Sequence, residues 1–172
     1  MSSRITRALQ RRQTVRVHTP LDDLESFLWV LLYTILEIGH CYGKLDADEL
    51  PWLQTMTDEE ESRLGLRITS LQSIVLATDI FRASDHLLIY REILGKWKAI
   101  AEASSVQLER ILRFDPDPAT LVESSKSTYA EYLSSGFHAL SQLPTSWAEG
   151  WAYGAALRKA DEEAVMALRT QG

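Results

Sequence analysis

The longest run of apolar residues in the chain lies between Leu24 and Ile38. On a helix its apolar side chains point in every direction, and a helix of that kind belongs in the centre of a domain. A buried strand is the competing interpretation, but the run is longer than most strands. The pattern therefore predicts one central helix over about 20–38, with core residues Leu24, Phe27, Leu28, Leu31, Leu32 and Ile35.

The residues just before this run carry the signals of a helix start. Thr19 is a residue type that caps exposed backbone N–H groups, and Pro20 suits the first helical position. Asp22 lies in the first turn, where an acid interacts favourably with the helix dipole. We predict Thr19 and Asp22 as the helix cap and Gly39 as the residue that stops the helix.

Further helices are expected after a loop over 41–56. Thr57 matches the first residue of a capping box, with a helix following it to about Ala77. Ser84 or Asp85 opens the next helix, which either runs on to Phe114 or breaks at the serine pair 104–105.

Two prolines, at positions 116 and 118, mark the clearest break in the chain. Apolar spacing predicts a helix over 119–143 after them, and a second capping box predicts a last helix over about 146–170. No stretch alternates as a strand does. The sequence therefore predicts an all-α helical bundle of five to seven helices in one domain, 19–172.

Composition narrows the class of protein. The 172 residues carry a net charge of −6, which argues against nucleic-acid binding, although the arm over 1–18 is rich in arginine. Cys41 is the only cysteine, so a reducing intracellular compartment, cytoplasmic or nuclear, is expected. The apolar run is too short for a predicted membrane span. A basic arm without acids also resembles a mitochondrial presequence, which is the alternative interpretation.

No complete set of catalytic residues stands out. The eight glycines form no phosphate-binding loop, no GxSxG motif occurs, and His and Cys lack metal-ligand spacing. The acids Asp22, Asp23 and Glu25 share one helical turn, where paired carboxylates cannot flank a substrate, so capping is the better interpretation. His18, His86 and His138 are expected to be surface or packing residues. We therefore predict no catalytic residue, cofactor or metal site.

The string Asp22-Asp23-Leu24-Glu25-Ser26-Phe27-Leu28-Trp29-Val30-Leu31-Leu32-Tyr33, preceded by His18-Thr19-Pro20-Leu21, resembles the central C-lobe helix, helix F, of fungal-type protein kinases. Casein kinase 1 proteins carry a related DDLES string. Met1-Ser2 resembles the end of the family's activation segment. The resemblance is strong over residues 1–36 and loose beyond. It implies a fold like the lower C-lobe of a kinase, and it implies that Asp23 anchors the catalytic loop. Leu28 stands where kinases often have glycine.

The resemblance also implies what is missing. A serine/threonine-type kinase needs a glycine-rich loop, a strand lysine, a His-Arg-Asp loop and an Asp-Phe-Gly magnesium ligand, none of which occurs here. ATP and magnesium would belong only to a complete parent. We therefore expect a truncated gene model, a gene fragment or a degenerate copy that is inactive alone.

Two other functions stay open. The chain could be a non-catalytic helical module that binds a protein partner through exposed apolar surface. It could also be an organelle-targeted helical protein whose basic arm is cleaved.

Overall fold

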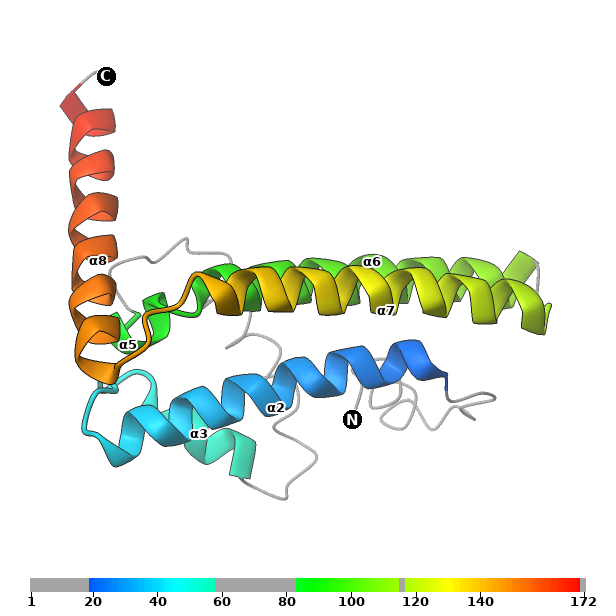
Figure 1. The fold of residues 1–172 in the computed structure, drawn as a ribbon, viewed down its shortest axis with the longest axis horizontal. Helices are drawn as coiled ribbons and strands as arrows, with labels where there is room; N and C mark the ends of the chain where they lie inside the picture. The colour runs from blue at the N-terminus through cyan, green and yellow to red at the C-terminus, as the bar shows by residue number, and fades with distance from the viewer. Residues whose placement is uncertain (1–18, 58–82, 115–116, 171–172) are drawn as a thin grey trace. The chain divides into compact units, whose positions relative to one another are not determined.

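The structure is a computed structural model that describes residues 19–57, 83–114 and 117–170 (Figure 1). In this part of the chain the helix is the only regular element, which confirms the all-α prediction. The helices are α2 (Pro20–Cys41), α3 (Leu50–Thr57), α5 (Asp85–Leu88), α6 (Arg91–Phe114), α7 (Pro118–Ser141) and α8 (Trp147–Thr170).

The contacts divide the chain into two compact units. The first contains the described residues up to Leu31 together with those from Ile93 to Ser141. The second contains those from Leu32 to Glu92 and those from Gln142 onward. The single domain over 19–172 stays a prediction, and each unit is described by itself below.

The first unit is built around a small apolar core. Leu21 and Leu24 of α2 pack with residues of α6 and α7, which run side by side in Figure 1. The buried members are Leu21, Leu24, Ile100, Leu108 and Tyr132, with Trp97, Leu112, Leu121 and Tyr129 packed against them.

An aromatic pair joins the helices of this core. The rings of Trp97 and Tyr132 stack with their centroids 4.1 Å apart, and the Trp97 Nε1–H donates to the Tyr132 carbonyl. The Tyr132 hydroxyl in turn donates to the Leu24 carbonyl of α2, at 3.1 Å. Burial raises the pKa of Tyr132 far above its ordinary value, so this hydroxyl keeps its proton and remains a donor.

α2 is buried on one side only, so the expectation of a helix buried all round is wrong. Phe27, predicted as core, is 50% exposed, and Val30 is 62% exposed. Leu31 is half-buried. Burial follows a single stripe with a spacing of three and four residues, made of Leu21, Leu24, Leu28, Leu32, Ile35 and Leu36.

The helix also runs past its predicted end. α2 continues through Gly39 to Cys41. A Cβ on Gly39 would lie 2.5 Å from a Leu45 methyl and 2.6 Å from the His86 ring. Glycine is therefore needed here for close packing of side chains and does not stop the helix.

α3 corrects the predicted loop over 41–56. This stretch contains Pro51, which lies in the first turn of α3, where a missing N–H costs nothing. Thr57, expected to cap a new helix, is the last residue of α3, and its hydroxyl donates to the Leu53 and Gln54 carbonyls. The helix predicted over 57–77 lies outside the described residues, as does the basic arm over 1–18.

The helix predicted to open at Ser84 or Asp85 is divided in the structure: α5 ends at Leu88 and α6 begins at Arg91. The predicted starts at Ser84 and Ser146 agree with the structure. Ser84 caps α5 by accepting from the Leu87 N–H, and Ser146 accepts from the Glu149 N–H at the start of α8. α6 is not broken at its serine pair, and within the helix the Ser104 hydroxyl donates to the Ile100 carbonyl one turn earlier.

Candidate functional site

The start of α2 is the first place where the sequence predicts function, and its two adjacent acids differ in environment. Asp22 is 3% exposed, and its Oδ2 accepts from the Thr19 N–H at 2.9 Å and from the Thr19 hydroxyl at 3.0 Å. This is one half of a capping box, with the acid reaching back to the cap residue. Thr19 and Asp22 therefore act together to close the helix end.

Asp23 lies close to Tyr129 of α7 instead. Its side chain is half-buried, and its charge helps burial to raise the pKa of Tyr129 on α7. The Tyr129 hydroxyl donates to the Pro20 carbonyl at 2.9 Å, so α7 contacts the first turn of α2. Asp23 is thus held at a fixed helix end, next to a phenol that stays protonated.

The exposed face of α2 begins at this acid. Asp23, Phe27 and Val30 are separated by four and three residues and therefore share one side of the helix. Phe27 and Val30 are the two large apolar residues that are exposed in the part of α2 that belongs to the first unit. The structure therefore places the Asp23 carboxylate at the start of an exposed apolar stripe made of Phe27 and Val30.

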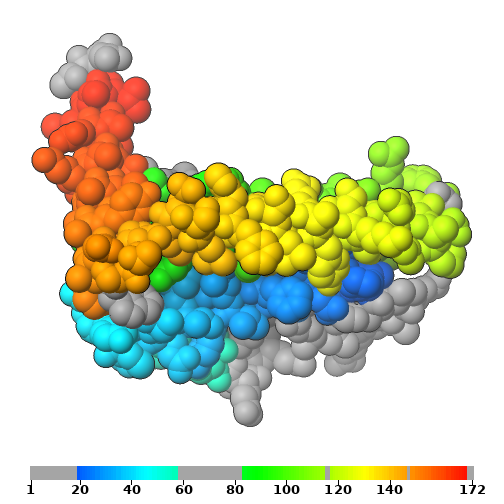
Figure 2. Space-filling model, in the orientation of Figure 1, coloured from blue at the N-terminus to red at the C-terminus, as the bar shows by residue number. Residues whose placement is uncertain are grey.

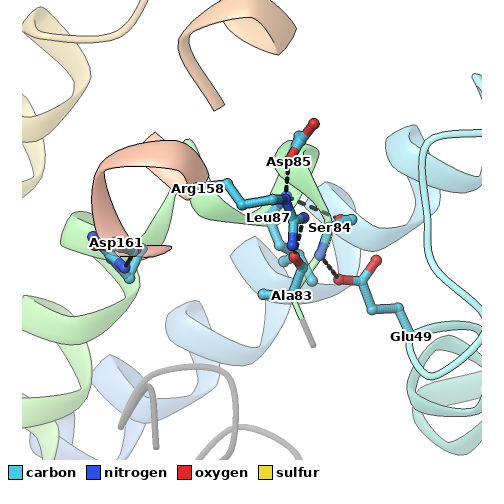
Figure 3. Close-up of polar contacts among 8 residues, drawn as sticks. Glu49, Ala83, Ser84, Asp85, Leu87, Arg158 and Asp161 are labelled. Carbon is cyan, nitrogen blue, oxygen red and sulfur yellow. Dashed lines mark hydrogen bonds and ion pairs between the residues drawn. The ribbon is translucent and has the colours of Figure 1, made fainter. Parts of the chain in front are cut away.

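The second unit contains a buried polar network that sequence reasoning missed (Figure 3). Glu49 is fully buried, and its carboxylate accepts from the Ser84 N–H at 2.6 Å and from the Asp46 N–H at 3.0 Å. Burial raises the pKa of Glu49, and the two N–H donors oppose that rise. The contact with Asp46 has the local spacing of a capping box, whereas the contact with Ser84 leaves no sequence signal, because Ser84 lies 35 positions away.

His86 is the second buried group of this unit. Its Nε2 lies 2.9 Å from the Ile35 carbonyl, an acceptor, so this nitrogen carries the hydrogen. Burial lowers the pKa of His86, and the bond to Ile35 opposes that shift only in part. The prediction of a packing histidine is confirmed here.

α8 is attached to this unit through charged groups. The Arg158 Nε donates to Asp85 Oδ1 at 2.6 Å, and its Nη2 donates to the Ala83 carbonyl (Figure 3). Arg91 pairs with Asp161 one turn further along α8. These contacts fix α8 against the residues around α5.

A cavity of about 240 Å³ opens beside this contact. Polar and charged side chains contribute to its wall, and the Lys44 ammonium lies 4.3 Å from the centre of the Trp151 ring. Both signs of charge occur in the lining. The lining includes Lys44, Asp46, Ser84, Asp85, His86 and Arg158.

The polar groups around this cavity have structural roles. The Ser84 hydroxyl serves as a helix cap and His86 donates to a backbone carbonyl, so they do not form a nucleophile and base. Within residues 19–57, 83–114 and 117–170, no three His, Cys, Asp or Glu side chains gather where they could hold a metal ion.

Comparison with known proteins identifies no relative: no family model matches the chain, and no curated protein or solved structure is similar to it. By length and composition alone, α2 is the one described helix that could cross a membrane, and 33% of its most apolar window is buried. The absence of a membrane partner stays a prediction.

Proposed function

We propose that the chain is the C-lobe part of a fungal-type protein kinase-like protein. The parent would be an ATP-dependent serine/threonine phosphotransferase, and the chain alone would be inactive. ATP and magnesium belong to the complete parent in this proposal, together with the motifs that position them.

The uncovered side of α2 carries the proposal. A kinase helix of this kind supports the catalytic loop with an acid at its first turn and with apolar residues further along. Asp23, Phe27 and Val30 offer such a surface, while Leu24 and Leu28 are buried in the unit itself. Asp22 belongs to the buried helix cap, and the proposal assigns the anchor role to Asp23, as the kinase resemblance implies.

Translation of the genomic DNA upstream of the Met1 codon tests this proposal. We expect strings like His-Arg-Asp and Asp-Phe-Gly in the same reading frame, as a clipped kinase requires. A stop codon in that frame with neither string upstream would contradict the proposal of a kinase parent.

The anchor role of Asp23 is tested in the recovered full-length protein. We expect Asp23→Asn to lower kcat by about 10- to 100-fold, because a displaced catalytic loop misplaces its base. The midpoint of thermal unfolding should change little. Asp22→Asn is the matched control, since it alters the neighbouring acid, and it should lower kcat less than Asp23→Asn does.

A second candidate function is a helical module that binds another protein. Exposed apolar side chains on α7 favour it, because large apolar patches on a protein surface mark interaction sites. Purified chain that stays monomeric and binds no protein would count against it.

A further inference from the structure

The cavity beside α5 and α8 lies within the second unit, and buried polar groups form part of its wall. Ser84 and His86 are 2% and 1% exposed, and a hydrogen bond to the backbone holds each of their side chains. Figure 2 shows the first turns of α8, in orange, next to the cyan residues that follow α2. Because its polar wall is fixed by these bonds, this part of the cavity is formed before any ligand arrives.

Arg158 adds a charged group to the wall, and the protein uses only part of its hydrogen-bonding capacity. The Nε donates to Asp85 and the Nη2 donates to the Ala83 carbonyl (Figure 3). In the part of the chain that the structure describes, the Nη1 has no acceptor. Arginine pairs strongly with carboxylates, so this nitrogen is a donor for a ligand oxygen.

The loop after α2 contributes a second cation and an acid to the same cavity. Lys44 and Asp46 both line it, and both are exposed. Within the described ranges neither the Lys44 ammonium nor the Asp46 carboxylate forms an ion pair, and the ammonium lies over the Trp151 ring. The rim of the cavity therefore carries one positive and one negative group with which a ligand can pair.

The charges of the wall restrict the class of ligand. Two cations line the cavity, Lys44 and Arg158. Two acids line it as well, Asp46 and Asp85, so the formal charges cancel. A simple anion would meet an unpaired acid at the rim, and a simple cation would meet an unpaired ammonium, and both contacts are unfavourable. A small molecule that carries both charges satisfies the two groups at once.

The volume restricts the size of the ligand. About 240 Å³ corresponds to roughly eight water molecules at about 30 Å³ each. Pockets for drug-sized ligands start at about 300 Å³, so this one suits a smaller molecule. The Trp151 ring and the Leu45 side chain, which also line the cavity, offer contacts for a small apolar group.

We propose that this cavity binds a free α-amino acid with a small aliphatic side chain. The ligand carboxylate accepts from the Arg158 Nη1 and from the Lys44 ammonium, and the ligand ammonium pairs with the Asp46 carboxylate. The aliphatic group lies against the Trp151 ring. The ligand is small and the rim is exposed, so the Kd should lie in the millimolar range. The site belongs to the second unit and does not depend on the kinase proposal.

Titration of the full chain with L-valine, followed by saturation-transfer difference NMR, tests this site. We expect saturable binding below tens of millimolar. Two analogues each lack one charge: 3-methylbutyrate has no ammonium, and isobutylammonium has no carboxylate. Each should bind at least about tenfold more weakly than L-valine. A cavity that holds water only would give no saturable binding of L-valine and would overturn the proposal, and so would equal affinity for either analogue.

Variants of the rim locate the binding. Lys44→Met and Asp46→Asn should each weaken L-valine binding by about tenfold or more, while the circular dichroism stays that of the natural chain, because both side chains are exposed. Asp48→Asn and Lys159→Met are the matched controls. Both residues are exposed and lie outside the cavity lining, so these variants should bind as the natural chain does. Unchanged affinity in Lys44→Met and Asp46→Asn would place the binding elsewhere and overturn the proposal.

Discussion

At the scale of single residues, buried polar groups of this protein are held by backbone partners. Asp22 accepts from the Thr19 N–H, Glu49 accepts from the Ser84 N–H, and His86 donates to the Ile35 carbonyl. Burying such a group without a partner costs about 1–3 kcal/mol, so each of them requires its partner to be in place. These residues therefore respond strongly to mutation, and Glu49 and His86 also to pH.

Asp22→Ala should lower the free energy of unfolding by about 1–2 kcal/mol, because it removes a helix cap and leaves the buried Thr19 N–H without its acceptor. Urea unfolding at neutral pH measures this. Asp23→Ala should cost less than about 1 kcal/mol, since Asp23 is only half-buried and its carboxylate is not the acceptor of the Thr19 N–H. Equal losses in the two variants would contradict the assignment of the cap to Asp22.

The titration of His86 should be visible in the pH dependence of the free energy of unfolding. Its pKa is lowered in the folded protein, so below the ordinary value of 6.5 the unfolded chain takes up a proton that the folded chain resists. Stability should therefore be complete above pH 6.5 and should fall as the pH drops below it. Glu49 acts in the opposite direction, because its raised pKa makes the folded protein take up its proton first.

His86→Gln separates these two effects. Glutamine can still donate to the Ile35 carbonyl but does not titrate, so the variant should lose less stability than the natural chain between pH 7.5 and pH 5.5. Urea unfolding of both chains at the two pH values measures the difference. If the free energy of unfolding falls equally with pH in both chains, His86 is not the group that causes the fall.

At the scale of elements, α7 and α8 depend on glycine for close contact, as α2 does at Gly39. A Cβ on Gly154 of α8 would lie 2.1 Å from the Asp85 carbonyl oxygen, which belongs to the α5 backbone. A Cβ on Gly136 of α7 would lie 2.8 Å from the Trp97 ring. The contact at Gly154 is the stricter one, because backbone cannot rotate away as a side chain can.

Gly154→Ala should lower the free energy of unfolding by about 2 kcal/mol or more, because α8 must move away from α5 and strain the Arg158–Asp85 pair. Gly150→Ala, one turn earlier in α8, is the control. Its Cβ would meet only Ile89, at 3.5 Å, so the better helix propensity of alanine should make it neutral or stabilising by up to about 1 kcal/mol. Similar losses in both variants would contradict this contact.

Substitutions on the buried and on the exposed side of α2 should also differ in their effect on the free energy of unfolding. Leu24→Ala should cost about 2–5 kcal/mol, since Leu24 is completely buried in the core of the first unit. Phe27→Ala should cost less than about 1 kcal/mol, because half of the Phe27 side chain is already exposed. Denaturant unfolding of the two variants gives the comparison, and a larger loss at Phe27 would mean that its side of α2 is covered.

At the scale of the whole molecule, the chain combines two compact units with apolar surface on α2 and on α7. If the chain is a kinase C-lobe part, as proposed, it lacks the sequence motifs that position ATP for phosphoryl transfer. We therefore expect Mg·ATP to leave the midpoint of thermal unfolding unchanged. Differential scanning fluorimetry with and without millimolar Mg·ATP measures this, and a saturable rise of several degrees would contradict the prediction.

The sequence determined the features that depend on neighbouring residues. The all-helical class, the cap at Thr19 and Asp22, the cap at Ser84 and the break before α7 are local, because they rest on spacing and on partners within one turn. α3 was missed, because a loop was predicted over 41–56, although its signal is also local: Pro51 suits the first turn of a helix.

Only the tertiary structure decided which side of each helix is covered. α2 is apolar all round, so its pattern could not show that Leu24 would be buried and Phe27 exposed; that depends on where α6 and α7 pack. The burial of Glu49 and His86, and the use of Gly39 and Gly154 at contacts, likewise depend on residues distant in the sequence. Periodicity specifies the faces of a helix, whereas packing selects the face that meets a neighbour.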